Sequence, residues 1–199
     1  MYRFIESIRV EHRQFQHLEQ HEWRFQRTRN HFFPGAAKQS LCEALSIPNH
    51  ISADVYKCRI VYDQTIQQIE FIPYQPKRIQ TLHLTEANHL DYAFKYEDRQ
   101  VFHDLLNRKA GADDILIVQY GWITDTSFSN IALFDGERWI TPKRTLLNGT
   151  SRQRLLRSGQ LIEQDIHINE LHRFSHMQLV NAMLLWQNRP EATQPFILI

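Results

Sequence analysis

The stretch ITDTSFSNI at residues 123–131 sets one carboxylate, Asp125, in a predicted loop among small hydroxyl residues. Lys95 stands thirty residues earlier, in AFKY at residues 93–96, and the turn LLNGTSRQ follows at residues 146–153. A lysine amine can condense with an aldehyde, and a lone carboxylate can pair with a protonated pyridine nitrogen. A Gly-Thr-Ser turn that opens a helix offers backbone N–H groups to phosphate. In this order, the three elements predict a site for pyridoxal phosphate.

Size and composition describe an ordinary soluble protein. A chain of 199 residues can form one large domain or two small ones. Hydrophobic residues make up 42% and charged residues 23%, and the formal net charge of +1 favours neither nucleic acid nor a membrane as a partner. Only Cys42 and Cys58 are present, and the N-terminus has no apolar signal region. We therefore expect a cytoplasmic protein without a disulfide framework.

The eleven histidines are numerous but mostly scattered. Two pairs, His17 with His21 and His172 with His176, are four residues apart and could each share a helix face. Neither pair has an obvious third ligand, and no Cys-x-x-Cys motif is present. We therefore expect surface or structural histidines and no metal.

Strand and helix patterns alternate along the whole chain. Periodicity and turn residues predict, in the first half, a strand at 4–10, helices at 17–27 and 36–45, a hairpin of strands at 55–62 and 67–74, and a strand at 78–84. In the second half they predict a helix at 99–110, strands at 115–120, 130–134 and 139–141, a helix at 151–158, a strand at 166–168 and an apolar run at 177–185. The turn Asp135-Gly136 joins two of these strands as a hairpin. The pattern predicts a mixed α and β (α+β) fold of two lobes, a smaller N-terminal lobe at 1–87 and a C-terminal lobe at 88–199.

Several motifs resemble the class IV aminotransferases, the fold-type IV pyridoxal-phosphate enzymes. The stretch at 123–131 is similar to the family pattern V-T-E-x-S-x-x-N-[LIV]. WITP at 139–142 is similar to the family strand that ends in T-P, and GTSR at 149–152 to G-[IV]-T-R. The resemblance runs from about Phe4 to the end of the chain. It implies the two-lobe fold of the D-amino-acid aminotransferases.

The N-terminal segment IESIR at 5–9, with Glu6 and Arg9, resembles the family motif F-E-T-[IV]-R. Because the chain begins almost at this motif, the resemblance implies a truncated N-terminal lobe. One wall of the pocket would then be open or supplied by a partner subunit.

The resemblance also implies the roles of two residues. Lys95 falls where the family keeps its Schiff-base lysine, although taken alone it would be a solvated lysine in a charged stretch. Asp125 falls where the family carries a glutamate that keeps the pyridine nitrogen protonated. Its side chain is one methylene shorter, and taken alone it would be a turn aspartate.

Phosphate is expected at two places. The N–H groups of Thr150 and Ser151, with the Ser151 hydroxyl, lie at a helix start, which favours an anion. Arg24, in HEWRF at 21–25, resembles the arginine of the family's H-x-x-R-L motif, which contacts phosphate; a helix-face arginine is the alternative. Leu147 matches a family position that packs on the cofactor ring, or is simply core.

The sequence motifs expected to bind the substrate are less specific than those expected to bind the cofactor. Arg59 lies on a predicted strand of the family's substrate side and could bind a carboxylate, or could be an exposed strand arginine. Asn181 and Ala182, in VNAM at 180–183, match the N-[AS]-[LM] sequence typical of aminodeoxychorismate lyases. Branched-chain transaminases tend towards G-T-A, and D-amino-acid transaminases towards a run of hydroxyl residues.

The resemblance thus favours a lyase of folate biosynthesis that forms 4-aminobenzoate and releases pyruvate. A branched-chain or D-amino-acid transaminase is the first alternative. A cofactor-binding protein with little or no turnover is the second, because of Asp125 and the shortened lobe. The substrate would be a small amino compound. Members of the family are usually homodimers, so the resemblance also implies a homodimer.

Overall fold

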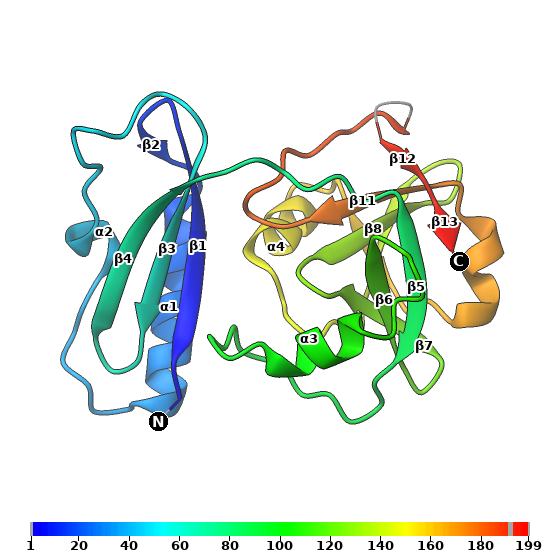
Figure 1. The fold of residues 1–199 in the computed structure, drawn as a ribbon, viewed down its shortest axis with the longest axis horizontal. Helices are drawn as coiled ribbons and strands as arrows, with labels where there is room; N and C mark the ends of the chain where they lie inside the picture. The colour runs from blue at the N-terminus through cyan, green and yellow to red at the C-terminus, as the bar shows by residue number, and fades with distance from the viewer. Residues whose placement is uncertain (1, 191–192, 199) are drawn as a thin grey trace. The chain divides into compact units, whose positions relative to one another are not determined.

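The computed structural model describes residues 2–190 and 193–198 (Figure 1). The chain forms two compact units. Unit 1 combines Met1–Pro76 with Phe94–Asp98, and unit 2 combines Lys77–Ala93 with Arg99–Ile199. The expected division after residue 87 differs from this grouping in two segments. Residues 77–87 belong to unit 2, and the segment that contains Lys95 belongs to unit 1.

Unit 1 is built on an antiparallel sheet in the order β2-β1-β3-β4. Its strands are β1 (Phe4–Glu11), β2 (Gln14–Phe15), β3 (Tyr56–Tyr62) and β4 (Ile66–Pro73). The structure confirms the predicted first strand and the predicted hairpin, which is β3 with β4. The segment 94–98 lies beside β1, because the Ile5 N–H donates to the Lys95 carbonyl (2.9 Å). This pairing places Lys95 in unit 1.

Helix α1 (Leu18–Phe32) packs on this sheet (Figure 1). It is longer than the predicted helix at 17–27. Its buried face carries polar as well as apolar side chains, namely His21, Arg24, Phe25, Thr28 and Arg29. Phe25 joins an apolar core formed with β1 and β3, made of Phe4, Ile8, Val10, Leu41, Cys58, Ile60 and Tyr62.

The predicted helix at 36–45 is wrong over most of its length, since only α2 (Leu41–Ala44) is helical. The carbonyls of Ala37 and Gln39 accept hydrogen bonds from the Arg29 guanidinium (2.6 and 3.3 Å). A carbonyl that bonds to this side chain is turned away from a helical partner. The segment before Ser40 is therefore extended.

Unit 2 contains two sheets, ordered β13-β5-β6-β7 and β10-β9-β8-β11-β12. The strands are β5 (Thr81–Glu86), β6 (Asp114–Gln119), β7 (Trp122–Thr126), β8 (Asn130–Phe134), β9 (Trp139–Pro142), β10 (Ile162–Gln164), β11 (His176–Val180), β12 (Gln194–Pro195) and β13 (Ile197–Leu198). Helices α3 (Gln100–Leu106) and α4 (Thr150–Arg157) and the 3-10 helix η1 (Ile168–Arg173) complete the unit. One apolar cluster takes side chains from both sheets, including Leu82, Leu116, Ile123, Ile131 and Met177.

Three features of unit 2 differ from the predictions. β5 pairs in parallel with β6, which is why residues predicted for the first lobe lie here. Of the strand predicted at 166–168, only an isolated β-bridge of His167 with Trp122 is present, because η1 begins at Ile168. Asp125 lies on a strand, β7, rather than in a loop.

Among the described residues, none of the helices is long and apolar enough to cross a membrane.

Candidate functional site

In unit 1, Lys95 lies in the segment beside β1, and its charge acts on the start of α1. The positive charge of Lys95 acts on His21, which is buried against the sheet. Burial lowers the pKa of His21, and the neighbouring Glu6 carboxylate opposes this only in part. Burial therefore favours the neutral form of His21.

Glu6 is fully buried and holds both His21 and Arg24. Arg24 Nε donates to Glu6 Oε1 (2.7 Å) and Nη2 to Oε2 (2.5 Å), while His21 Nδ1 lies 2.6 Å from Oε2. Burial raises the pKa of Glu6, but the Arg24 charge and the hydrogen bonds from Arg24 and His21 outweigh it and hold that pKa at about 2. Glu6 is thus ionised and fixes the direction of the Arg24 guanidinium.

Sequence reasoning missed this role of Glu6, although a signal was present. Phe4, Glu6, Ile8 and Val10 alternate along β1, so Glu6 points to the same face as three core residues. A carboxylate on a core face needs a buried cation or several donors. Arg24 and His21, one helical turn apart, supply them.

Arg59 lies on β3, opposite Ser7 of β1. Its Nη1 donates to Glu70 Oε2 and its Nη2 to Glu97 Oε1, both at 3.0 Å. Glu97 also pairs with Arg3 (2.7 Å). Two carboxylates therefore already neutralise the arginine that we expected to bind a substrate carboxylate, and a substrate would have to displace one of them.

In unit 2, Asp125 is nearly buried on β7, with 4% of its surface exposed. Asn130 Nδ2 donates to Oδ1 (2.8 Å) and the Leu147 N–H to Oδ2 (2.9 Å), so both carboxylate oxygens are fixed. Burial raises the pKa of Asp125 to about 6, although these two hydrogen bonds and the charge of Arg152 oppose the rise. The carboxylate is oriented, yet its charge is incompletely compensated.

Asn130 also explains why a glycine stands at position 149. Its Nδ2 donates to the Leu147 carbonyl (2.8 Å), which ties the turn to Asp125. A Cβ added at Gly149 would lie 2.2 Å from Asn130 Oδ1, closer than any real contact. Gly149 is therefore required for this turn to approach Asn130. Asn130 was not among the predicted site residues, although it is the asparagine of the quoted motif.

Helix α4 begins directly after this turn. Thr150 and Ser151 are buried in its first turn, and no side chain caps the Gly149 end. The N–H groups of a first helical turn have no partner within the helix. Arg152 fastens the helix by donating from Nη2 to the Pro142 carbonyl and to Glu163 (both 2.9 Å).

Asn181 follows β11, which pairs with β8 so that Val180 lies opposite Asn130. Its Nδ2 donates to Ser129 Oγ (2.6 Å), and its Oδ1 accepts from the Met183 N–H (2.9 Å). Ala182 is half-buried in the same turn.

In unit 1, the structure places Lys95 and Arg24 so that the charges of both act on His21. In unit 2 it brings together the remaining predicted cofactor residues and the Asn181 turn, namely Asp125, Leu147, Thr150, Ser151, Asn181 and Ala182.

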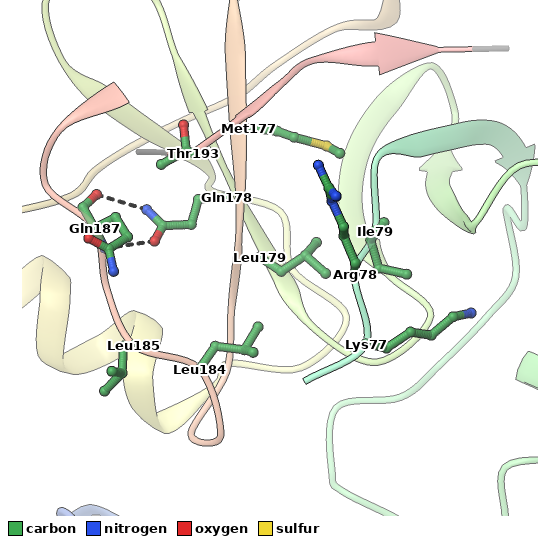
Figure 2. A pocket seen from close by; sticks show the side chains of 10 residues that line it. All are labelled: Lys77, Arg78, Ile79, Met177, Gln178, Leu179, Leu184, Leu185, Gln187 and Thr193. Carbon is green, nitrogen blue, oxygen red and sulfur yellow. Dashed lines mark hydrogen bonds between the residues drawn. The ribbon is translucent and has the colours of Figure 1, made fainter. Parts of the chain in front are cut away.

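Unit 2 also has a pocket of about 200 Å³ that includes none of the predicted site residues. Figure 2 shows the segment 77–79 on one side and β11 with the loop after it on the other. Gln178 and Gln187 close that loop through two hydrogen bonds (2.7 and 3.0 Å). The lining is Lys77, Arg78, Ile79, Met177, Gln178, Leu179, Leu184, Leu185, Gln187 and Thr193. Within residues 2–190 and 193–198, no three His, Cys, Asp or Glu side chains gather to hold a metal ion.

Residues 3–188 match the family Amino-transferase class IV, and the chain belongs to this family, whose cofactor is pyridoxal phosphate. A protein of unknown role from Haemophilus influenzae (strain Rd) is 29% identical over 185 residues, which cover 92% of this chain and 98% of the relative. A crystal structure of a candidate 4-amino-4-deoxychorismate lyase from Haemophilus somnus 129PT has a TM-score of 0.83 at 29% identity, over 92% of this chain and 97% of that one.

A more distant structure, the pyridoxal-phosphate-bound form of a hypothetical aminotransferase from Mycobacterium tuberculosis, has a TM-score of 0.72 at 15% identity. It covers 98% of this chain and 81% of that one. These likenesses confirm the predicted fold-type IV architecture. They leave the choice between lyase and transaminase to experiment.

Proposed function

We propose that this chain binds pyridoxal phosphate and acts as a 4-amino-4-deoxychorismate lyase, which releases pyruvate and forms 4-aminobenzoate. The observation that carries the proposal is the Asp125 carboxylate. It is buried, both of its oxygens are fixed by N–H donors, and it belongs to the motif that the family uses for its cofactor.

The electrostatics of Asp125 fit this cofactor. Its pKa near 6 means that burial still disfavours the charged form. Among the described residues Asp125 forms no ion pair, because its bonded partners are an amide and a backbone N–H. A protonated pyridine nitrogen would supply the missing positive charge. The shorter aspartate suits this role if the ring lies close to β7.

The other residues would hold the remaining parts of the cofactor. Lys95 would bind the aldehyde carbon of pyridoxal phosphate, and Leu147 would pack on the pyridine ring. Arg24 and the N–H groups of Thr150 and Ser151 would bind the phosphate. When bound, pyridoxal phosphate supplies an aldehyde that takes up amines and a ring that withdraws electrons.

Within the reaction, the chain's own residues bind, orient and move protons. Lys95, as a free amine, would take the proton from the substrate carbon that bears the amine. The substrate's C–O bond to its three-carbon side group then breaks. That group leaves as enolpyruvate, which gains a proton to become pyruvate, while the ring becomes aromatic. Asn181 would orient the Ser129 hydroxyl at the substrate side, since it donates to Ser129 Oγ at 2.6 Å.

The Asn181-Ala182 sequence and the name of the Haemophilus somnus relative favour the lyase over a transaminase. Both reactions need the same proton transfer by Lys95. They differ in where the proton goes next and in whether an amine is passed to a keto acid.

The test starts from purified protein supplied with pyridoxal phosphate, beside Lys95→Ala. We expect a visible absorbance band in the wild type that borohydride removes and that Lys95→Ala lacks. Aminodeoxychorismate is then added, and pyruvate is followed through lactate dehydrogenase. Release of pyruvate supports the lyase, and amine transfer among keto acids without pyruvate supports the transaminase. A band without either reaction would make this a cofactor-binding protein without turnover.

We also propose a homodimer, on the resemblance to the family alone, and a cytoplasmic location, on the scarcity of cysteine. Light scattering coupled to size-exclusion chromatography measures the oligomeric state. A monomer at micromolar concentration would contradict the homodimer.

A further inference from the structure

A substrate with a ring carboxylate needs a cation to hold it, and Arg59 is already neutralised by Glu70 and Glu97. Another arginine in unit 1 forms no ion pair with any acidic side chain of the described residues. This residue is Arg27, which lies on the exposed side of α1, one helical turn after Trp23. A role for Arg27 in binding the substrate rests on the proposed function.

Aromatic side chains hold Arg27 in place. Its guanidinium carbon lies 5.7 Å from the centre of the Trp23 ring and 5.4 Å from that of Phe94. His31, one turn further along α1, stacks on Phe94 with ring centres 4.7 Å apart. Contacts of this kind attract a guanidinium through the ring faces and limit its side-chain freedom. We call these four residues, Trp23, Arg27, His31 and Phe94, the Arg27 platform.

The charge of Arg27 remains available. Over the residues that the structure describes, Arg27 makes no ion pair and no side-chain hydrogen bond. Its guanidinium N–H groups can therefore donate two parallel hydrogen bonds to a carboxylate. Trp23, 46% exposed, adds a flat apolar surface beside the cation.

The platform lies near Lys95 within the same unit. Phe94 directly precedes Lys95. The charge of Lys95 lowers the pKa of His21 on α1. Arg27 follows His21 by six residues on that helix, a rise of roughly 9 Å. This rise separates Arg27 from His21, and a small ring with an amine at one end and a carboxylate at the other spans a length of the same order.

We propose that Arg27, held between Trp23 and Phe94, binds the ring carboxylate of the amino substrate whose amine reaches Lys95. The ligand class is a flat six-membered ring with an amine and a carboxylate on opposite carbons. Arg27 is a specificity residue in this proposal, since it touches the substrate away from the reacting carbon.

The test compares 4-aminobenzoate with its neutral analogue 4-aminobenzamide by isothermal titration calorimetry, on protein with and without pyridoxal phosphate. Wild type should bind the carboxylate about tenfold more tightly than the amide, the worth of a hydrogen bond to a charged group. Arg27→Gln should remove this preference, and Arg27→Lys should keep part of it. The matched control is Arg108→Gln, which removes one exposed arginine charge from unit 2.

Equal binding of the two ligands by wild type, or no binding of either, overturns the proposal. So does a preference that survives Arg27→Gln, above all if Arg59→Gln removes it instead. With active enzyme, Arg27→Gln should raise KM about tenfold and leave kcat within about twofold. The visible cofactor band decides the proposed function separately. A band without carboxylate preference defeats only the role of Arg27, and carboxylate preference without a band defeats only the cofactor.

Discussion

Replacing Glu6 by glutamine should destabilise unit 1 strongly. The amide keeps the shape of the side chain but removes the charge that binds Arg24 and His21. The pKa of Glu6 is held at about 2 against an ordinary value of 4.5. At about 1.4 kcal/mol for each pH unit, the ionised carboxylate contributes about 3 kcal/mol. The same figure is near the lower end of the cost of leaving a buried arginine unpaired.

Urea denaturation at neutral pH, followed by circular dichroism, measures this loss as the free energy of unfolding. Because the folded state lowers the pKa of Glu6, the stabilisation is complete above about pH 5 and fades as the pH falls towards about 2. The difference between wild type and Glu6→Gln should therefore shrink over that range. The control is Glu70→Gln, whose carboxylate pairs with Arg59 at a more exposed position and should cost less than about 1 kcal/mol.

A loss below about 1 kcal/mol for Glu6→Gln at neutral pH would refute this reasoning. So would a difference between wild type and variant that stays constant down to about pH 3.

Three further expected outcomes concern unit 2. Gly149→Ala should displace the Asn130 amide, lower the melting temperature by several degrees and weaken the binding of pyridoxal phosphate, as thermal melts and absorbance titration measure. For Asp125, whose folded pKa of about 6 lies above its ordinary value of 3.8, stability should fall by up to about 3 kcal/mol as the pH rises from about 4 to 6. Asp125→Asn should abolish that fall in urea titrations across this range. Asn181→Ala frees the Ser129 hydroxyl and should lower kcat/KM about tenfold without changing the cofactor band, whereas an unchanged kcat/KM would exclude its substrate role.

Local pattern was enough to predict much of the fold. The alternation at residues 4–10 and the hairpin at 55–74 depend on neighbours in sequence, and both are present as β1, β3 and β4. The missed strand β7 follows a tight turn in which Tyr120 and Gly121 both have positive φ, a hairpin geometry that the prediction overlooked. The parallel pairing of β5 with β6 joins segments about thirty residues apart, which no local pattern reveals.

In the candidate site, too, local features could be predicted from the sequence and contacts between distant residues could not. The order of Lys95, Asp125 and the Gly149 turn is local information, and the residues of unit 2 do cluster. The ion-pair partners of the charged residues, in contrast, lie far away in the sequence. Glu6 meets Arg24 eighteen residues later, and Arg59 meets Glu97 thirty-eight residues later. Both roles therefore became visible only in the folded chain.

The most direct test of the account is to locate the cofactor on the chain. Protein loaded with pyridoxal phosphate is reduced with borohydride, digested and examined by mass spectrometry. We predict a single phosphopyridoxyl group, on the peptide that contains Lys95, and no such group in Lys95→Ala. A group on another lysine, or none in a protein that is folded and supplied with the cofactor, would contradict the central claim.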